Sequence, residues 1–373
     1  MQRLLSLGML AAVLGGGYAV LNGWKPADVQ RVVGAAGSVV QGAASNQYQY
    51  PQQGYGAPAV NGAVGQGYDS AAPGFAPTPV APSSVIRIAT YNIQVFGDSK
   101  ASNMNVMRTL AAIVQQFDIV AIQEIRTKDA YFIDKFLRDY VNAGGRRYSR
   151  LVGERLGRSN SKEQYAYLYD TATIQVNPNL IYTVNDDAND LLHREPFVAM
   201  FATRVANPFT FILVNTHTDP DETDQELDAL AQVLDVVRRY GPGEDDVILL
   251  GDLNTAVSIK PAAGSFGVAR SSQRQLEPRD LRALGRIPGI YPVIRDQPTN
   301  TRKNKLHDNI LVNRGSTTEF TGRAGVFDLE QQYGLTREQA LMVSDHLPVW
   351  AEFSIVEGGT PGRMASGAPA IGR

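Results

Sequence analysis

The sequence has 373 residues, with 35 Lys and Arg residues against 37 Asp and Glu residues, so its formal net charge is −2. A hydrophobic fraction of 43% can form a large core, which excludes a wholly disordered or fibrous protein. The absence of cysteine excludes disulfides, thiolate metal sites and a cysteine nucleophile. The near-neutral charge provides no nonspecific electrostatic basis for binding nucleic acid, so such a function must come from a defined site.

Residues 1–21 have the pattern of a targeting segment. Arg3 precedes an uncharged run of 18 residues, Leu4 to Leu21. This length fits either a signal peptide that is cleaved on export or an N-terminal membrane anchor, and Arg3 favours a cytoplasmic amino end. A buried helix of the folded domain is the alternative. Both targeting interpretations predict an exported or membrane-anchored protein.

The rest of the chain divides into three parts. Residues 22–84 are rich in Gly, Ala, Pro, Gln and Tyr and nearly free of charge, which predicts a disordered linker. Residues 85–356 contain no linker-like stretch and are expected to form one catalytic domain. Residues 357–373 are again rich in Gly, Pro and Ala and predict a frayed, disordered tail.

The domain mixes strand and helix patterns. Runs rich in β-branched and aromatic residues predict strands at Val85–Ile93, Asp118–Ile125, Gln164–Tyr169, Phe197–Arg204, Phe209–Thr216, Asp246–Gly251, Asp308–Val312 and Pro348–Ile355. Amphipathic patterns predict helices at Asn103–Phe117, Asp129–Ala143 and Glu222–Tyr240. The last is the clearest, because its apolar residues follow three-and-four spacing and Gly241-Pro242 ends the run. The mixture predicts an α/β domain in which sheets pack face to face with helices outside.

Several predicted strands end in polar residues that a simple core would not place there. Asn92 and Glu124 follow two apolar runs, and Asp252 follows a third. His217 and His346, two of only four histidines, each lie near a carboxylate at the border of an apolar run. Any one of these residues alone is typical of a turn or cap. Together they indicate a site at the strand ends, where rigid strands position accessible side chains.

These residue types suit metal-assisted acid–base chemistry. Asp252 and Asn254 are two residues apart, so on an extended segment their side chains would point the same way and offer oxygen atoms to one point. Such oxygen ligands, to which Glu124 adds a carboxylate, suit Mg²⁺, Mn²⁺ or Ca²⁺. One histidine can accept a proton from water while another donates one to a leaving alkoxide. A paired carboxylate would orient each imidazole and raise its pKa.

The segments, in this order, resemble the endonuclease/exonuclease/phosphatase superfamily: Tyr91-Asn92-Ile93, Gln123-Glu124-Ile125-Arg126, Asn215-Thr216-His217, Gly251-Asp252-Leu253-Asn254, Asp308 and Ser344-Asp345-His346-Leu347-Pro348-Val349. Others are similar to the deoxyribonuclease I branch in particular: Phe96 to Asn103, Leu156 to Glu163, and Arg194-Glu195-Pro196. The likeness extends from about Val85 to Ile355, nearly the whole folded domain.

The resemblance implies a four-layered α/β sandwich with two central mixed β-sheets flanked by helices, and a nuclease groove at one edge. It implies an acid–base pair in which a carboxylate orients each histidine: His217 with Glu163, and His346 with Asp308. It implies that the divalent cation and the scissile phosphate are bound by Glu124, Asp252, Asn254, Asn92 and Asp345. It implies that the DNA backbone is bound by Arg126 and Arg194, because a guanidinium matches a phosphate in forked geometry. The reaction would be hydrolysis of a P–O3′ bond by in-line attack of water.

The chain also departs from the family. Gln94 replaces an arginine and Ser161 a tyrosine, so a phosphate or groove contact is lost at each, and His307 replaces a tyrosine. The family's disulfides are absent. An acidic stretch lies where the family has a structural Ca²⁺ loop: Asp186, Asp187, Asp190 and Glu195. A solvated polar turn is the alternative interpretation of this stretch.

The resulting prediction is a Mg²⁺- or Mn²⁺-dependent, deoxyribonuclease I-like endonuclease, with Ca²⁺ as a further cation, that cuts DNA with little sequence specificity. The alternative is a phosphoesterase of the same fold that acts on lipid or inositol phosphates, such as a sphingomyelinase, which an N-terminal anchor would hold near its substrate. A binding module without activity is the third hypothesis, although every acid–base and metal position is filled. We expect a monomer with DNA as its substrate, a membrane tether through the N-terminus and no obligate protein partner.

Overall fold

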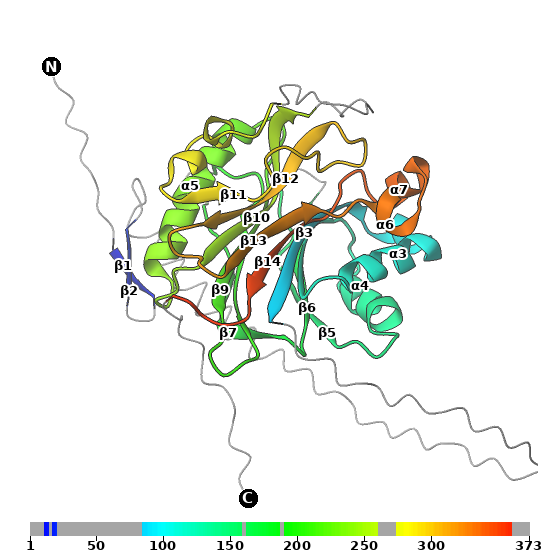
Figure 1. Cartoon of the computed structure of the whole chain (residues 1–373), viewed down its shortest axis with the longest axis horizontal. Coiled ribbons are helices and arrows are strands. Elements are labelled where there is room, and N and C mark those ends of the chain that lie inside the picture. The colour runs from blue at the N-terminus through cyan, green and yellow to red at the C-terminus, as the bar shows by residue number, and fades with distance from the viewer. Residues whose placement is uncertain are drawn as a thin grey trace, which may run out of the picture.

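Two six-stranded β-sheets form the centre of the domain (Figure 1). The computed structural model describes residues 11–14, 17–20, 84–158, 162–186, 190–259 and 274–359. Each of these sheets contains one parallel pair of neighbouring strands, and its other strand pairs are antiparallel. Both central sheets are therefore mixed, as predicted.

The first sheet has the strand order β13-β14-β3-β4-β6-β5. Its strands are β3 (Val85–Phe96), β4 (Ile119–Ile125), β5 (Tyr148–Val152), β6 (Gln164–Asp170), β13 (Phe320–Val326) and β14 (Val349–Ser354). The parallel pair is β3 and β4. Because β14 lies beside β3, the two ends of the domain meet in the middle of this sheet.

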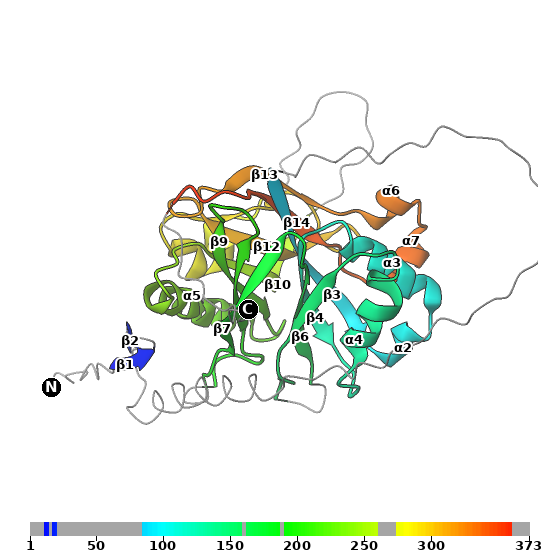
Figure 2. The same ribbon diagram turned by 90° about the horizontal axis from the view of Figure 1, so that it is seen from below.

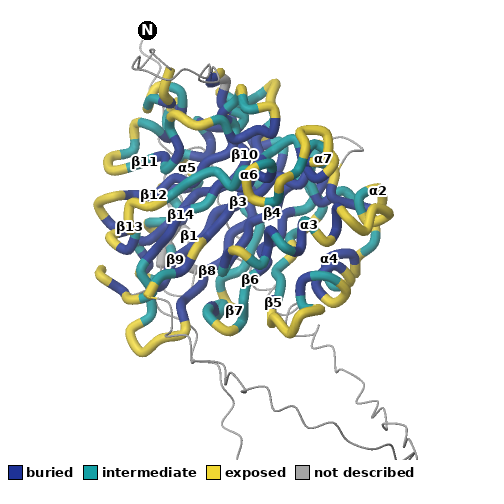
Figure 3. The backbone as a smooth tube through the Cα atoms, turned by 45° about the vertical axis from the view of Figure 1, so that its right-hand side comes forward, coloured by how far each residue is buried: buried dark blue, intermediate teal, exposed yellow. Residues whose placement is uncertain are grey.

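The second sheet has the order β11-β12-β10-β9-β8-β7. Its strands are β7 (Ile174–Thr183), β8 (Phe197–Thr203), β9 (Thr210–His217), β10 (Val247–Ser258), β11 (Ile290–Pro292) and β12 (Lys305–Asn313). The parallel pair here is β9 and β10. Every residue of β8 and β9 is buried, because the strands are covered on both faces (Figure 3).

Helices cover the outer faces of both sheets, which completes four layers (Figure 2). On the side of the first sheet lie α2 (Asp98–Ala101), α3 (Met104–Val114), α4 (Phe132–Phe136), η1 (Leu137–Val141), α6 (Leu329–Tyr333) and α7 (Arg337–Val343). The second sheet is covered by α5 (Thr223–Tyr240), and the short turns η2 (Pro278–Leu281) and η3 (Leu284–Arg286) adjoin it. The predicted four-layered α/β sandwich is therefore confirmed.

Aromatic side chains fill the space between the sheets. Tyr167 from the first sheet packs edge-on against Phe201 from the second, with ring centroids 5.3 Å apart. Phe353 stacks on Phe209 at 5.8 Å. The Tyr167 hydroxyl donates to the carbonyl of Leu213 at 3.0 Å, so a buried polar bond also joins the sheets.

The predicted strands and helices are present, with ends shifted by a few residues. The predicted helix at Asp129–Ala143 is formed by α4 and η1, in which the second segment has the wider π-helical hydrogen bonding. In the two central sheets, the strands that the sequence patterns did not indicate are β5, β7, β11 and β13.

The chain ends are described only in part. Within the targeting segment, β1 (Ala11–Leu14) and β2 (Gly17–Val20) form an antiparallel pair. Among the described residues, no helix is long and apolar enough to cross a membrane. The predicted linker lies outside the described residues apart from Ser84. Residues 357–359 are the described part of the predicted tail, and the buried Glu357 is hydrogen-bonded to Asn207 and Thr210.

Candidate active site

The predicted site residues converge at the carboxyl ends of the two parallel strand pairs. Asn92 and Glu124 come from β3 and β4 of the first sheet, and His217 and Asp252 come from β9 and β10 of the second. The Asn92 amide joins them, because its Nδ2 donates to Glu124 Oε1 at 3.2 Å and to Asp252 Oδ2 at 3.0 Å. The site therefore spans both sheets.

The neighbouring strands of the second sheet place three acid–base groups in one row. Asp252 lies opposite His217 on one side and opposite Asp308 on the other. His346 reaches the same place from the loop before β14, and Glu163 from the residue before β6. The structure thus brings together both histidines and both carboxylates that the family resemblance assigns to them.

The strands lose their regular geometry at this level. Register shifts follow Asn92 in β3 and Asp252 in β10, and Glu124 has a left-handed backbone with φ 62°. Gly251 has φ 151°, and a Cβ atom at this position would overlap the Thr216 carbonyl oxygen. Glycine is therefore required where β10 approaches β9 just before Asp252.

Asn254 does not lie where simple strand alternation places it. The expectation that Asp252 and Asn254 point the same way on an extended segment is wrong, because Asn254 has φ 45° and the strand bulges here. The Asn254 backbone N–H instead donates to Asp252 Oδ1 at 3.0 Å, and its side-chain amide donates to the Thr218 carbonyl at 2.8 Å. Asn254 thus fixes the carboxylate and the adjacent loop.

His217 is held from both sides of its ring. Its Nδ1 lies 2.7 Å from Glu163 Oε1, and its Nε2 lies 3.6 Å from Asp252 Oδ2. Burial opposes protonation of the ring, but the two carboxylates outweigh it and raise the pKa of His217. The Nδ1 contact orients the ring so that Nε2 faces the centre of the site.

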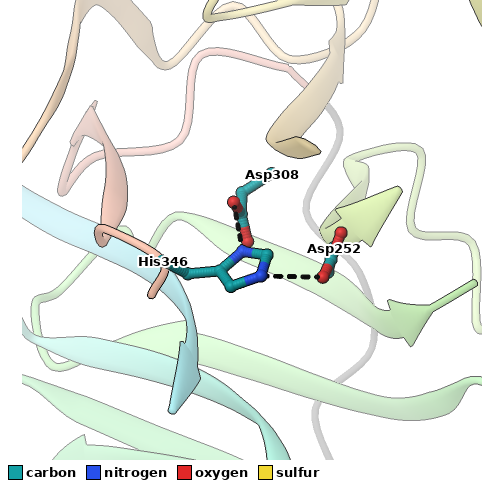
Figure 4. Close-up of side chains that lie close together, drawn as sticks. All are labelled: Asp252, Asp308 and His346. Carbon is teal, nitrogen blue, oxygen red and sulfur yellow. Dashed lines mark hydrogen bonds and ion pairs between the residues drawn. The ribbon is translucent and has the colours of Figure 1, made fainter. Parts of the chain in front are cut away.

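His346 repeats this arrangement (Figure 4). Its Nδ1 lies 2.9 Å from Asp308 Oδ2, and its Nε2 lies 3.6 Å from Asp252 Oδ2. The Thr299 hydroxyl donates to the same Asp308 oxygen at 2.9 Å. Burial opposes protonation here also, but Asp308 and Asp252 raise the pKa of His346 to about 10.

Asp252 is the group that the two imidazoles share. One oxygen, Oδ2, faces Nε2 of both histidines and accepts from Asn92. Burial disfavours the carboxylate, yet His346 and His217 together lower the pKa of Asp252 to about 2. The site therefore keeps Asp252 ionised throughout the physiological range.

Glu163 also pairs with both predicted DNA-binding arginines. Arg194 is buried, with Nε 3.3 Å from Glu163 Oε1 and 3.1 Å from the His217 carbonyl. Arg126 is 29% exposed, and one of its terminal nitrogens lies 3.3 Å from Glu163 and 3.4 Å from Glu124. Arg126 is thus the more accessible of the two, whereas Arg194 supports Glu163 and the His217 backbone.

The site contains oxygen atoms that suit a hard cation. Asn92 Oδ1 and Asp308 Oδ1 are buried without a hydrogen-bond partner of normal geometry among the described residues. The Asp345 side chain is 42% exposed and lies on the same side, 3.9 Å from His346 Nε2. The Asn92 amide nitrogen links the carboxylates of Glu124 and Asp252, which are ligand types that suit a divalent cation. One ligand atom each of Asp252, Asp308 and His346 also lies within 4.8 Å of the other two, so this set could hold a metal ion.

Three supporting residues lack any sequence signal of their own. Thr299 binds Asp308, Ser344 Oγ donates to the Asn92 carbonyl at 2.7 Å, and the Tyr165 hydroxyl accepts from the His217 backbone N–H at 2.9 Å. Ser344 lies two residues before His346, and only the family resemblance of the segment Ser344 to Val349 points to it. Thr299 and Tyr165 belong to unremarkable segments.

The predicted Ca²⁺ loop is only partly described. Asp187 lies outside the described residues, as does Ser161, and Asp190 Oδ1 pairs with Arg158 Nε at 3.0 Å. Asp186 is turned inward, where Oδ2 accepts the Leu192 backbone N–H. The Asp190 backbone N–H donates to the Asp186 carbonyl at 2.9 Å, so Asp186 and Asp190 belong to one hydrogen-bonded turn.

Residues 89–346 match the Endonuclease/Exonuclease/phosphatase family. The chain is 31% identical to deoxyribonuclease gamma of Rattus norvegicus over 274 residues, which cover 71% of this chain and 83% of that protein. It is 32% identical to deoxyribonuclease-1 of Bos taurus over 271 residues, covering 71% and 90%. A solved endonuclease/exonuclease/phosphatase family protein from Bacteroides thetaiotaomicron is similar over 73% of this chain and 98% of its own, with 15% identity and a TM-score of 0.45.

Proposed function

The chain belongs to the endonuclease/exonuclease/phosphatase family, and we propose that it is a divalent-cation-dependent endonuclease that hydrolyses DNA with little sequence specificity. One observation carries this proposal: two imidazole–carboxylate pairs, His217 with Glu163 and His346 with Asp308, converge on the single carboxylate Asp252. The relatives named deoxyribonucleases, which share about a third of the sequence, support DNA as the substrate.

We assign the cation to the oxygen cluster beside Asp252. Glu124, Asn92 and Asp252 would hold it, with Asp345 nearby and Asn254 positioning Asp252 through its backbone N–H. A bound Mg²⁺ or Mn²⁺ would stabilise negative charge on the phosphate oxygens in the transition state.

The two imidazoles supply the proton transfers. Their Nδ1 atoms are engaged by Glu163 and Asp308, so Nε2 is the reactive atom of each ring. One Nε2 accepts a proton from water as the water oxygen bonds to phosphorus, and the other gives a proton to O3′ as the P–O3′ bond breaks. The products are a phosphomonoester and a free 3′ hydroxyl, and proton exchange with solvent restores both rings. Each transfer contributes about 10²–10⁴-fold in rate.

The acid and the base need opposite protonation states, and the carboxylates around the two histidines influence both. The neighbouring carboxylates raise the pKa of His217 and raise that of His346 to about 10, so His346 is cationic at neutral pH. The cationic form suits the acid and the neutral form suits the base. Because Asp252 contributes to both raised pKa values, neutralising that carboxylate would lower the pKa of both rings. Cation binding at Asp252 and acid–base competence are therefore coupled.

We assign binding of the DNA backbone to Arg126, with Arg194 in support. Arg126 is partly exposed at the edge of the site, where a phosphate could replace one of its carboxylate partners. Because a phosphate contact carries no sequence information, Arg126 is expected to act on all DNA sequences alike.

We propose further that residues 1–21 direct export or hold the enzyme at a membrane. The support is the uncharged run after Arg3, which fits a signal peptide or anchor. The enzyme would then act outside the cytoplasm, as a monomer.

The test is conversion of supercoiled plasmid to nicked circles in Mg²⁺, with EDTA and the His217→Ala variant as negative controls. His193→Ala is the matched histidine control, because His193 pairs with Asp219 outside the two catalytic pairs. Nicking that both EDTA and His217→Ala abolish, while His193→Ala retains it, would support the proposal. Intact plasmid in a preparation that hydrolyses sphingomyelin or an inositol phosphate would refute it.

A further inference from the structure

Four acidic side chains meet at the end of the second sheet that is opposite to the active site. Glu244 and Asp246 lie just before β10, Glu319 precedes β13, and Glu357 follows β14. Asp246 lies directly before β10 and six residues before Asp252, which separates the cluster from the proposed catalytic carboxylate by about 20 Å along the extended chain. All four side chains are buried.

The negative charges and polar atoms of this cluster have few compensating partners. Both oxygens of Asp246 and Oε2 of Glu319 have no hydrogen-bond partner of normal geometry among the described residues. In the described part of the chain, no ion pair joins Asp246, Glu319 or Glu357 to a lysine or arginine. The buried hydroxyl of Thr317 faces Asp246 and also lacks a partner of normal geometry. Buried polar atoms are rarely left in this state, so the cluster requires a ligand or a proton.

The spacing of the oxygens is that of ligands around one ion. One oxygen each of Asp246, Glu319 and Glu357 lies within 4.8 Å of the other two. Oxygen ligands bound about 2.4 Å from a calcium ion lie at most about 4.8 Å from each other. Without an ion, three buried carboxylates this close together would repel one another if all were ionised.

We propose that Asp246, Glu319 and Glu357 bind a structural Ca²⁺ ion, with Thr317 as a neutral oxygen ligand. The donor set contains only oxygen, which favours a hard cation. The ligands come from three separate segments and share no regular strand geometry. Calcium accepts such irregular sets of six to eight oxygens, whereas magnesium demands a near-ideal octahedron.

The ion would hold the carboxyl end of the domain against its core. Glu357 already binds the start of β9, because its Oε2 accepts from the Thr210 backbone N–H at 3.1 Å. Glu319 accepts from the Gly358 backbone N–H, which joins the loop before β13 to the same end. An ion at Asp246 would add the start of β10 to this junction. Because the three segments meet only in the folded chain, the ion would bind the native state and stabilise it by mass action.

The experiment uses the full chain with Glu124→Gln and Asp252→Asn, which removes the proposed catalytic cation site. Bound Ca²⁺ is counted by titration calorimetry with CaCl₂, and Tm is compared in Ca²⁺ and in EDTA. We expect Asp246→Asn in this background to bind one fewer Ca²⁺ per chain and to lose the Ca²⁺-dependent rise in Tm. In EDTA its Tm should be close to that of the parent, because asparagine has nearly the size of aspartate and adds no charge to the cluster.

Two further variants make the result decisive. Glu319→Gln should behave as Asp246→Asn does, which guards against a single variant that fails to fold. Asp235→Asn is the control, since it removes an exposed carboxylate that pairs with Arg239 on α5, and it should retain the Ca²⁺ count and the Tm rise. An unchanged Ca²⁺ count in both Asp246→Asn and Glu319→Gln would overturn the proposal and show that protons alone compensate the cluster.

Discussion

Glu163→Gln tests how the protein orients and charges His217. The buried carboxylate contacts His217 Nδ1 at 2.7 Å and Arg194 Nε at 3.3 Å, and both contacts lose their charge in the variant. Glutamine keeps an oxygen for the imidazole, so we expect that contact to lose about 1 kcal/mol, the difference between charged and neutral hydrogen bonds. Arg194 loses its buried counter-charge, which should destabilise the folded state by about 2 kcal/mol more. The loss is limited because Arg194 still donates to the His217 carbonyl. The folded state should therefore be destabilised by about 3 kcal/mol.

Catalysis should fall by about 10²-fold, at the lower end of the range for one proton transfer, because glutamine still orients the ring. Since Glu163 raises the pKa of His217, its loss should move the His217 limb of the pH–rate profile to lower pH. Plasmid nicking at saturating Mg²⁺ over a range of pH measures both effects, and urea unfolding measures stability. Glu154→Gln, which changes an exposed glutamate, is the matched control. A rate within threefold of wild type with an unmoved pH profile would refute the assigned role.

Gly251→Ala should prevent folding or destabilise the protein by about 3 kcal/mol or more in urea unfolding, because its Cβ would overlap the Thr216 carbonyl; a loss below about 1 kcal/mol would contradict this. Burial raises the pKa of Glu226 to about 6, so its contribution to stability is present below its unfolded pKa and is lost as pH rises through 6. Wild-type unfolding free energy should fall over this window more than that of Glu226→Gln, and parallel curves would exclude Glu226 as the cause. Arg126→Ala should weaken cleavage of all DNA sequences alike, which cleavage of a random-sequence pool would show, and a sequence-dependent loss would contradict backbone binding.

The strands that could be predicted are the central ones, and those that could not lie at the edges of the sheets. Strands β5, β7, β11 and β13 are the outermost strands of the two sheets. An edge strand packs against one neighbour and buries less, so its apolar pattern is weak. In β7, Asn177-Pro178-Asn179 has the composition of a turn, yet it forms an irregularity between paired segments. Edge position is a tertiary property, and local sequence does not express it.

The site residues also divide into those that the local sequence indicates and those that it does not. Residues at strand ends, such as Asn92 and Asp252, are visible because a polar group interrupts an apolar run. Partners such as Glu163 are 54 residues from their histidine, and only the family resemblance points to them. Asn254 shows the limit of alternation, because the bulge in β10 turns it toward the backbone. The buried acidic cluster at the far end has no local signal, since Asp246 by itself is typical of a strand-start turn.

The aromatic layer between the two sheets sets the distance between the catalytic groups that the sheets carry. Asn92 and Asp252 belong to opposite sheets and meet at 3.0 Å, so the thickness of this layer sets their separation. A substitution such as Phe201→Leu, remote from any reacting atom, would let the sheets settle closer together or slide. Displacement of catalytic groups by about 1 Å can reduce rates by about 10²-fold. Substitutions in this layer are thus constrained both by the stability of the fold and by the distance that the layer sets between the catalytic groups at the strand ends.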